Sequence, residues 1–187
     1  MTLLLDEKVI ALEGALADAG IPHAFGGALA LAYYATPRGT HDIDLNVFLP
    51  VRDAERVLAA LSPLGVVPGG ARARRDLRQR GQVRLAWDHT PLDLFFAYDP
   101  FHRSCKQRVR RVRFGEGVTI PVLSAEDLSV FKVLFDRAKD RSDVAEMVYA
   151  LGPDFDAVYA LAWLRRMLGE EDERLRRFEK LLRPPPP

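Results

Sequence analysis

The sequence predicts an α+β fold, with a core of mixed helices and strands over residues 1–121 and a helical bundle over residues 122–187 packed on it. Three observations support this prediction. Helical and strand-like patterns alternate in the first part of the chain. From Ser124 onward the apolar residues follow helical spacing only. The 187 residues are 48% hydrophobic and 28% charged, which is typical of a globular protein with one medium-sized core.

The chain begins with a helix, a strand, a second helix, a second strand and a third helix. These elements are predicted over residues 6–19, 21–25, 28–35, 42–48 and 51–61. The second helix follows a glycine pair and ends before Pro37, because the residue before proline disfavours helical geometry. In segment 42–48, apolar and polar residues alternate strictly, which is the pattern of a strand with one buried face.

The rest of the core reads as strands, and the remainder of the chain as helices. Strands are predicted over residues 64–67, 72–78, 82–87, 91–98, 109–114 and 118–120. Helices are predicted over residues 124–139, 142–151, 154–168 and 170–183. Ser124 and Asp127 form a helix-capping pattern at the start of the first of these helices.

Composition excludes several classes of protein. No apolar run approaches the roughly 20 residues of a membrane-spanning helix, so we expect no membrane partner. The acidic start of the chain does not resemble a secretory signal, which favours a cytoplasmic location. The single cysteine, Cys105, excludes an intramolecular disulfide and a cysteine-cluster metal site.

Positive charge is concentrated in residues 72–113, although the whole chain has a net charge of only +1. Such a basic segment on an otherwise acidic chain favours a polyanionic partner, with RNA as the first candidate. A solvated arginine-rich surface would show the same pattern. Alternation in this segment would place several arginines on one face of a sheet. The candidate RNA-binding residues are Arg72, Arg74, Arg75, Arg78, Arg80, Arg108 and Arg110.

Three aspartates are the candidate catalytic and metal-binding residues. Asp42 and Asp44 lie two apart on the predicted strand, so their side chains project to the same face. Asp93 lies within an apolar strand, where a carboxylate is costly unless it is paired or bound to a cation. A neighbouring strand could bring Asp93 beside the pair. Oxygen ligands suit Mg²⁺ or Mn²⁺, so the pattern predicts a divalent metal site.

Candidate phosphate-binding residues flank these carboxylates in the sequence. Gly26 and Gly27 lie between a short strand and a helix, where backbone N–H groups can hold an anion. Arg38 lies between this loop and the aspartates. Lys132 could supply charge where pyrophosphate leaves, although an exposed lysine paired with Asp136 explains its position equally well.

Three segments resemble parts of a known superfamily. GGALALAYYATPRGTHDIDL resembles the opening motif of the nucleotidyltransferase (polymerase-beta-like) superfamily, a glycine pair followed by two aspartates that alternate with apolar residues. PLDLFF resembles the strand with the third carboxylate of that superfamily. SAEDLSVFKVLFDRAKDRSDV is similar to a later motif of AbiEii and MenT-like toxins of toxin–antitoxin systems.

The resemblance implies a nucleotidyltransferase-like mixed-sheet core and metal-dependent transfer of a nucleoside monophosphate from an NTP, with release of pyrophosphate. In the toxin branch the acceptor is the 3′ end of tRNA, and the transfer blocks translation and growth. The implied roles are triphosphate binding by Gly26 and Gly27, metal binding by Asp42 and Asp44, metal or base function for Asp93, and nucleotide binding by Lys132 and Asp143. Ala28 departs from the pattern, because it offers no hydroxyl to phosphate.

The resemblance also implies a cognate antitoxin. Some antitoxins of MenT-like systems are kinases that act on a Ser or Thr in this loop, which makes Thr40 a candidate phosphorylation site. A cap of the turn by the Thr40 side chain is the competing interpretation. Two other functions remain open: a nucleotidyltransferase that modifies a small-molecule antibiotic, and a catalytically silent domain that binds nucleotide.

Overall fold

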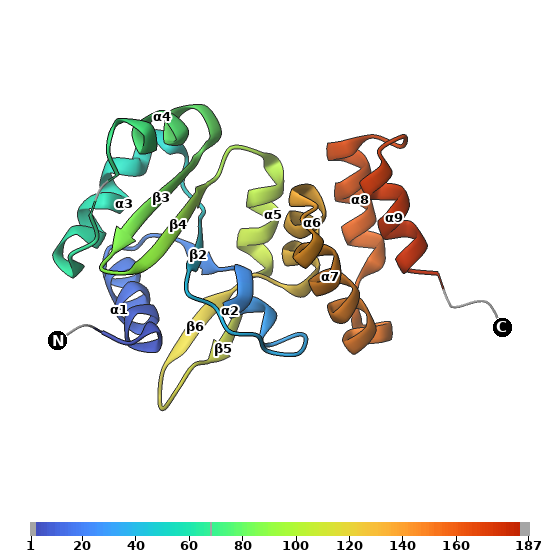
Figure 1. Cartoon of the computed structure of the whole chain (residues 1–187), viewed down its shortest axis with the longest axis horizontal. Helices are drawn as coiled ribbons and strands as arrows, with labels where there is room; N and C mark the ends of the chain where they lie inside the picture. The colour runs from blue at the N-terminus through green and yellow to red at the C-terminus, as the bar shows by residue number, and fades with distance from the viewer. Residues whose placement is uncertain (1–2, 68, 184–187) are drawn as a thin grey trace. The chain divides into compact units, whose positions relative to one another are not determined.

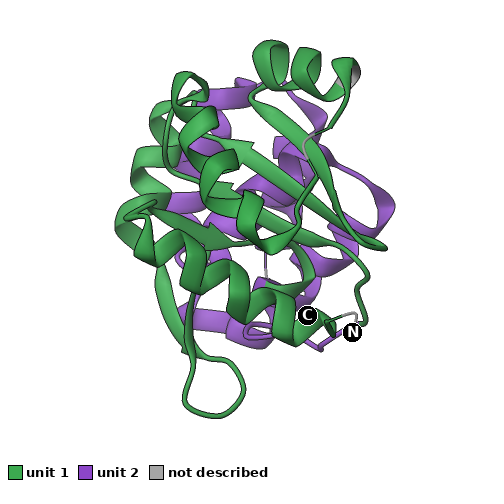
Figure 2. Cartoon of the chain, turned by 90° about the vertical axis from the view of Figure 1, so that its left-hand side faces the viewer, with its two compact units in different colours: residues 1–29, 39–123 green, residues 30–38, 124–187 purple. Residues whose placement is uncertain are grey.

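The computed structural model describes residues 3–67 and 69–183, and it confirms the α+β class. The chain forms two compact units (Figure 2). A sheet unit comprises residues 1–29 and 39–123, and a helical unit comprises residues 30–38 and 124–187. The division falls within the short helix α2 (Gly27–Leu31). The segment 30–38 thus belongs to the helical unit, although it precedes most of the sheet in the sequence.

The sheet unit is built on a mixed six-stranded sheet, in the order β3-β4-β2-β1-β6-β5 (Figure 1). The strands are β1 (His23–Phe25), β2 (Ile43–Val47), β3 (Gln82–Trp87), β4 (Thr90–Phe96), β5 (Arg110–Arg113) and β6 (Thr119–Val122). β2 is parallel to β4 and antiparallel to β1, while β1 is parallel to β6. β3–β4 and β5–β6 are antiparallel pairs.

The central strands follow from the alternation in the sequence. On β2, Ile43, Leu45 and Val47 are fully buried. Asp44 points to the opposite face and is half-buried. β4 repeats this pattern, because its leucines and Phe96 are also fully buried. The core of the sheet therefore lies on one face of β2 and β4, and their polar residues lie together on the other.

Helices of the sheet unit are α1 (Leu5–Asp18), α3 (Ala54–Leu61), α4 (Ala71–Arg80) and α5 (Pro100–Arg108), with 3₁₀ turns at Val51–Asp53 and Ser62–Leu64. α1 fixes the turn between β3 and β4 through Lys8, which is 1% exposed. Its Nζ donates hydrogen bonds of 2.9 Å to the carbonyl of Trp87 and to the hydroxyl of Thr90. A buried ammonium needs such partners, so Lys8 holds the hairpin that contains Asp93.

Three sequence predictions in the first part of the chain are wrong. Segment 72–78 is part of helix α4, because its Ala, Arg and Leu residues favour helix more strongly than their alternation favours a strand. No element was predicted over helix α5, which Asp99 caps and Pro100 begins. The helix predicted over 28–35 ends at Leu31. Segment 64–67 forms a turn with one isolated bridge at Val67.

The helical unit contains α6 (Ala125–Phe135), α7 (Ala138–Leu151), α8 (Ala157–Leu168) and α9 (Glu173–Leu181), with a 3₁₀ turn at Gly152–Asp154. α6 packs against the other three. The predicted cap is confirmed, because the Ser124 hydroxyl accepts the N–H of Asp127. Asp136 adopts left-handed geometry (φ 53°) and separates α6 from α7. Among the described helices, none is both long and apolar enough to cross a lipid bilayer.

Candidate active site

Two of the predicted carboxylates lie side by side on neighbouring strands. Asp44 of β2 is directly opposite Asp93 of the parallel strand β4. Adjacent strands are about 4.8 Å apart, so the two side chains share one face at short range. The prediction that a neighbouring strand brings Asp93 next to Asp44 is confirmed. Asp42 lies at a bend just before β2 and is half-buried.

Arg84 compensates part of the negative charge of this pair of carboxylates. It lies opposite Asp93 on β3. Its Nε and one terminal nitrogen donate to the two carboxylate oxygens of Asp93, at 2.8 and 2.5 Å. Asp93 is buried, whereas the Arg84 side chain is 65% exposed. The hydrogen bonds and charge of Asp93 raise the pKa of Arg84, and the charges of Asp42 and Asp44 add smaller effects. One guanidinium thus interacts with all three acids.

The glycine pair makes room for the side chains of β2. A Cβ on Gly27 would lie 1.8 Å from Oδ2 of Asp44, and one on Gly26 would lie 2.8 Å from Nδ2 of Asn46. Gly27 also has a φ of 53°, which favours glycine. The Gly26 N–H donates to the backbone carbonyl of Asp44. Because they lack a side chain, both glycines allow the backbone of the loop to lie against β2.

The Thr40 hydroxyl is bonded to the first aspartate. It donates to Oδ1 of Asp42 at 2.5 Å, and the Asp42 N–H approaches the hydroxyl oxygen at 3.4 Å. This is a turn closed by a short polar side chain, as one of the two interpretations of Thr40 predicted. The same contact places the hydroxyl beside the carboxylates.

The three acids suit a divalent cation in type but not in their present arrangement. Carboxylate oxygens are the ligands that Mg²⁺ and Mn²⁺ prefer. In residues 3–67 and 69–183, however, no group of three or more His, Cys, Asp or Glu side chains is arranged to hold a metal ion. Arg84 occupies both oxygens of Asp93, and Thr40 occupies one oxygen of Asp42. A cation at this site would have to compete with Arg84.

Lys132, Asp143 and Arg38 form a second cluster, within the helical unit. Nζ of Lys132 donates to Oδ2 of Asp143 at 2.6 Å. Arg38 donates to both oxygens of the same carboxylate, at 3.2 and 3.1 Å. Burial acts to raise the pKa of Asp143, but the hydrogen bonds from Arg38 and Lys132 outweigh it and lower the pKa below 3.8. Asp143 is therefore ionised and shared by two cations.

The alternative in which Lys132 is exposed and paired with Asp136 is wrong. Lys132 is 4% exposed, and its other acidic neighbour is Asp140 at 3.6 Å. The Asp136 carboxylate pairs with Arg141 and Arg177 instead. Asp140 is fully buried and also accepts from Arg137, which precedes α7. The cluster thus places a buried lysine between two carboxylates.

The basic segment does not form one surface. Arg74, Arg75, Arg78 and Arg80 are exposed on α4, which packs against the edge strand β3. Arg108 ends α5 and Arg110 begins β5, the opposite edge of the sheet. Five strand spacings, roughly 24 Å, separate the two edges. The prediction that alternation places these arginines on one face of a sheet is therefore wrong. Arg72 belongs to α4, but its side chain lies outside the described residues.

Sequence reasoning did not identify Arg84 or Lys8 as parts of this arrangement. A two-residue turn at Asp88 and His89 sets the register that pairs Arg84 with Asp93. The apolar patterns on either side of that turn were the signal in the sequence from which the hairpin could have been predicted. Nothing in the sequence indicates that Lys8 is buried, because it follows two acidic residues at the start of a helix and is expected to be exposed.

The fold is shared with solved nucleotidyltransferase structures. The antibiotic-resistance factor ANT(2'')-Ia, in its solution structure, matches with a TM-score of 0.60 and 16% identity over 84% of this chain and 89% of that chain. Its crystal structure with adenylyl-2''-tobramycin matches with the same TM-score and 17% identity over 87% and 98%. An antigenic nucleotidyltransferase-like protein from Paracoccidioides brasiliensis gives 0.51 and 18% over 92% of each chain.

The predicted nucleotidyltransferase-like fold is confirmed by these structures. No protein-family profile matches the chain, and no curated protein matches it in sequence. At 16–18% identity these matches define the fold alone. The acceptor substrate and the catalytic residues must be inferred from the side chains of this chain.

Gly27→Ala tests the approach of the loop to Asp44. The new Cβ would clash with the carboxylate, and left-handed geometry alone costs a non-glycine residue about 1–2 kcal/mol. We expect the free energy of unfolding, measured in urea, to fall by more than about 2 kcal/mol. Gly39→Ala is the matched control, because nothing lies within 4 Å of its Cβ position. Equal stability of the two variants would contradict the constraint.

Arg84→Gln tests the competition between Arg84 and a cation. A positive charge about 4 Å away costs a divalent cation roughly 2 kcal/mol even in water, so Mn²⁺ should bind the variant about 30-fold more tightly. Electron paramagnetic resonance of free Mn²⁺ measures this affinity. Arg78→Gln, an exposed arginine of α4, controls for net charge. Unchanged or weaker binding in Arg84→Gln would show that Arg84 does not compete.

Asp143→Asn tests the cluster in the helical unit through pH. Because the pKa of Asp143 is lowered on folding, its ionisation stabilises the protein above pH 3.8, and this contribution is lost as pH falls through the lowered pKa. The variant should be about 3 kcal/mol less stable at pH 7, and its stability should fall less steeply between pH 4 and 2. Asp18→Asn, an exposed position at the end of α1, should follow the wild type in acid unfolding curves. Parallel curves for Asp143→Asn would refute the assignment.

Proposed function

We propose that this chain is a nucleotidyltransferase that moves a nucleoside monophosphate from an NTP to an acceptor and releases pyrophosphate. The observation that carries the proposal is the register of β2 and β4, which sets Asp44 against Asp93 beside the Gly27 loop. Two carboxylates on one polar face gain nothing for folding, because like charges directly opposite each other repel. Their proximity is readily explained by a cation-binding site.

In this proposal, Asp42, Asp44 and Asp93 would hold a divalent cation, Mg²⁺ or Mn²⁺, which would stabilise the charge that develops on the transferred phosphate. Gly26 and Gly27 provide a backbone that phosphates can approach closely. Arg38, Lys132 and Asp143 bind the nucleotide in this proposal. Arg38 and Lys132 supply positive charge to its phosphates, and both are held by ion pairs with Asp143.

We propose the 3′ end of tRNA as acceptor and toxin activity as the consequence. The basic helix α4 supports an RNA acceptor, because it packs on the strand that contains Arg84. Arg74, Arg75 and Arg78 lie within about 100° of one another around this helix, so they form one basic stripe. Phosphate contacts of this kind position RNA without reading its sequence.

A cognate antitoxin is the partner that this function requires, and a kinase is one form of it. A phosphate on Thr40 would add a charge of about −1.5 to −2 next to Asp42, to which the hydroxyl is bonded. It would repel the carboxylates or bind their cation. Either effect would switch the enzyme off.

A small-molecule antibiotic is the second candidate acceptor. The fold match to ANT(2'')-Ia, which has been crystallised with adenylyl-2''-tobramycin, favours it. The two acceptors differ in charge, since RNA requires basic surfaces and an aminoglycoside requires acidic ones.

Transfer from each labelled NTP to total tRNA, and separately to tobramycin, tests the proposal. The wild-type protein with Mg²⁺ should label tRNA, and Asp44→Asn or Asp93→Asn should slow transfer by at least about 100-fold. Asp18→Asn should retain the wild-type rate. Label on tobramycin alone would assign the second acceptor. No transfer to either, with NTP still bound, would indicate a catalytically silent domain.

The salt dependence of tRNA binding tests the basic stripe of α4. Each lost phosphate contact lowers the slope of log affinity against log salt by about 0.7–0.9, so Arg74→Gln/Arg75→Gln/Arg78→Gln should reduce it by about 2. Arg110→Gln/Arg111→Gln/Arg113→Gln, at the opposite edge of the sheet, removes the same charge as a control. A reduced slope only in the β5 variant would move the RNA to that edge.

A further inference from the structure

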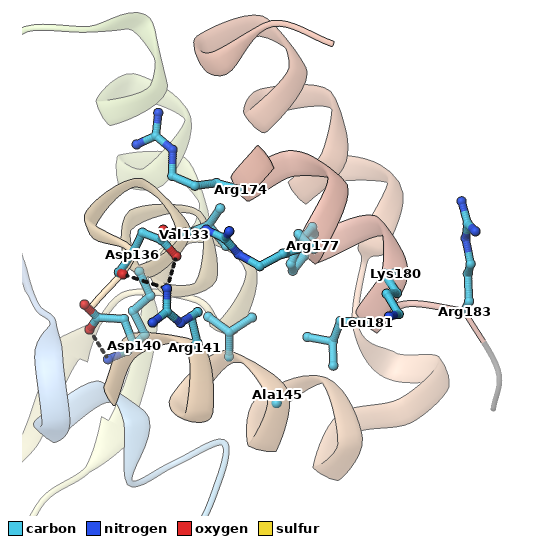
Figure 3. A pocket seen from close by; sticks show the side chains of 13 residues that line it. Val133, Asp136, Asp140, Arg141, Ala145, Arg174, Arg177, Lys180, Leu181 and Arg183 are labelled. Atoms are coloured by element: carbon cyan, nitrogen blue, oxygen red, sulfur yellow. Dashed lines mark hydrogen bonds and ion pairs between the residues drawn. The ribbon is translucent and has the colours of Figure 1, made fainter. Parts of the chain in front are cut away.

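The helical unit contains a groove of about 650 Å³ between α7 and α9 (Figure 3). α6 forms its floor, through residues such as Val133. The walls include Ala145 of α7 and Leu181 of α9. All residues that line the groove belong to this one unit. Its volume lies within the range of about 300–1,000 Å³ that small-molecule sites occupy.

The inside of the groove is apolar and narrow. Val133, Val144 and Phe178 are 8%, 3% and 2% exposed, so each presents only a small part of its surface. Leu181, at the mouth, is 37% exposed. A partner helix has a diameter of about 10 Å with its side chains and needs a broad apolar face. A thin ring system or hydrocarbon chain fits this strip better.

The rim of the groove is positively charged. Arg141 and Arg177 both reach Asp136, at 3.3 and 2.5 Å (Figure 3), and Arg177 also lies 3.8 Å from Glu173. The side chains of Lys180 and Arg183 are exposed and form no hydrogen bond or ion pair with a residue that the structure describes. The rim therefore has positive charge left for a ligand.

We propose that this groove binds a small organic anion with an apolar body. The body lies on Val133, Val144 and Phe178, and the anionic group lies at the rim with Lys180 and Arg183. Binding of this anion needs neither an NTP nor a metal, although Lys132, which is assigned to the nucleotide above, also lines the groove. The same rim repels polycationic ligands, so it is not a place for an aminoglycoside acceptor.

The fluorescent probe 1-anilinonaphthalene-8-sulfonate (ANS) tests this proposal on the full chain. It combines a thin aromatic body with one sulfonate, and N-phenyl-1-naphthylamine is its uncharged analogue. We expect ANS to bind one site per chain, at least about five-fold more tightly than the analogue, because one cation near an anion gives about this factor. Equal affinity for the two probes would overturn the role of the rim.

Three variants locate the probe. Ala145→Trp fills the groove and should abolish binding of both probes. Leu181→Glu, at the exposed mouth, should weaken ANS and leave the uncharged analogue almost unchanged. Lys180→Gln/Arg183→Gln should weaken ANS about ten-fold or more. Arg165→Gln/Arg176→Gln removes the same charge from α8 and α9 at positions that do not line the groove, and it should leave ANS affinity unchanged.

Circular dichroism of each variant confirms that the helical unit is folded, and Leu181→Glu keeps the test informative if Ala145→Trp unfolds. Displacement of ANS by dodecanoate or by 2-naphthoate distinguishes an aliphatic from an aromatic acid, and either result supports the proposal. ANS binding that survives both Ala145→Trp and Leu181→Glu would overturn it. Loss of the ANS site as protein concentration rises would also overturn it and assign the groove to a second copy of the chain.

Discussion

Two carboxylates directly opposite each other on parallel strands are the constraint on which the site depends. Asp44 and Asp93 share one polar face, and like charges at such positions destabilise a sheet. The protein offsets this cost locally, since Arg84 on the next strand is bonded to Asp93 at both oxygens. Lys8 then fixes the turn of that hairpin from the buried side of α1. Arg84 and Lys8 thus keep the two carboxylates in place and offset the repulsion between them.

The helical unit repeats the same solution with opposite roles. Here the buried group is a cation, Lys132, and the neighbours that compensate it are Asp140 and Asp143. Arg38 comes from a distant part of the sequence and adds a second cation beside Asp143. Buried ion pairs add little net stability compared with apolar packing, but losing one partner is expensive. Residue types in this cluster are therefore tightly constrained, whatever ligand they meet.

Much of the sheet could be predicted from sequence because β2 alternates cleanly between apolar and polar residues and β4 is a short, mostly apolar run. Helix α4 could not, since Leu77 is its single large apolar residue and its arginines alternate like a strand. The carboxylates were visible as Asp42, Asp44 and Asp93, since an acid in an apolar strand is unusual. Arg84 was not, because its role depends on hairpin register, and register follows from a turn whose length must be known first.

The strand order has a consequence for colloidal behaviour. β5 is an edge strand, with backbone groups on one side that no neighbouring strand of the sheet satisfies. Its sequence is Arg-Arg-Val-Arg, and the three arginines are exposed. Two such edges that approached each other would bring six guanidinium groups together, so strand-to-strand association is electrostatically blocked. Protection against aggregation therefore explains these arginines without any contact between this edge of the sheet and a nucleic acid.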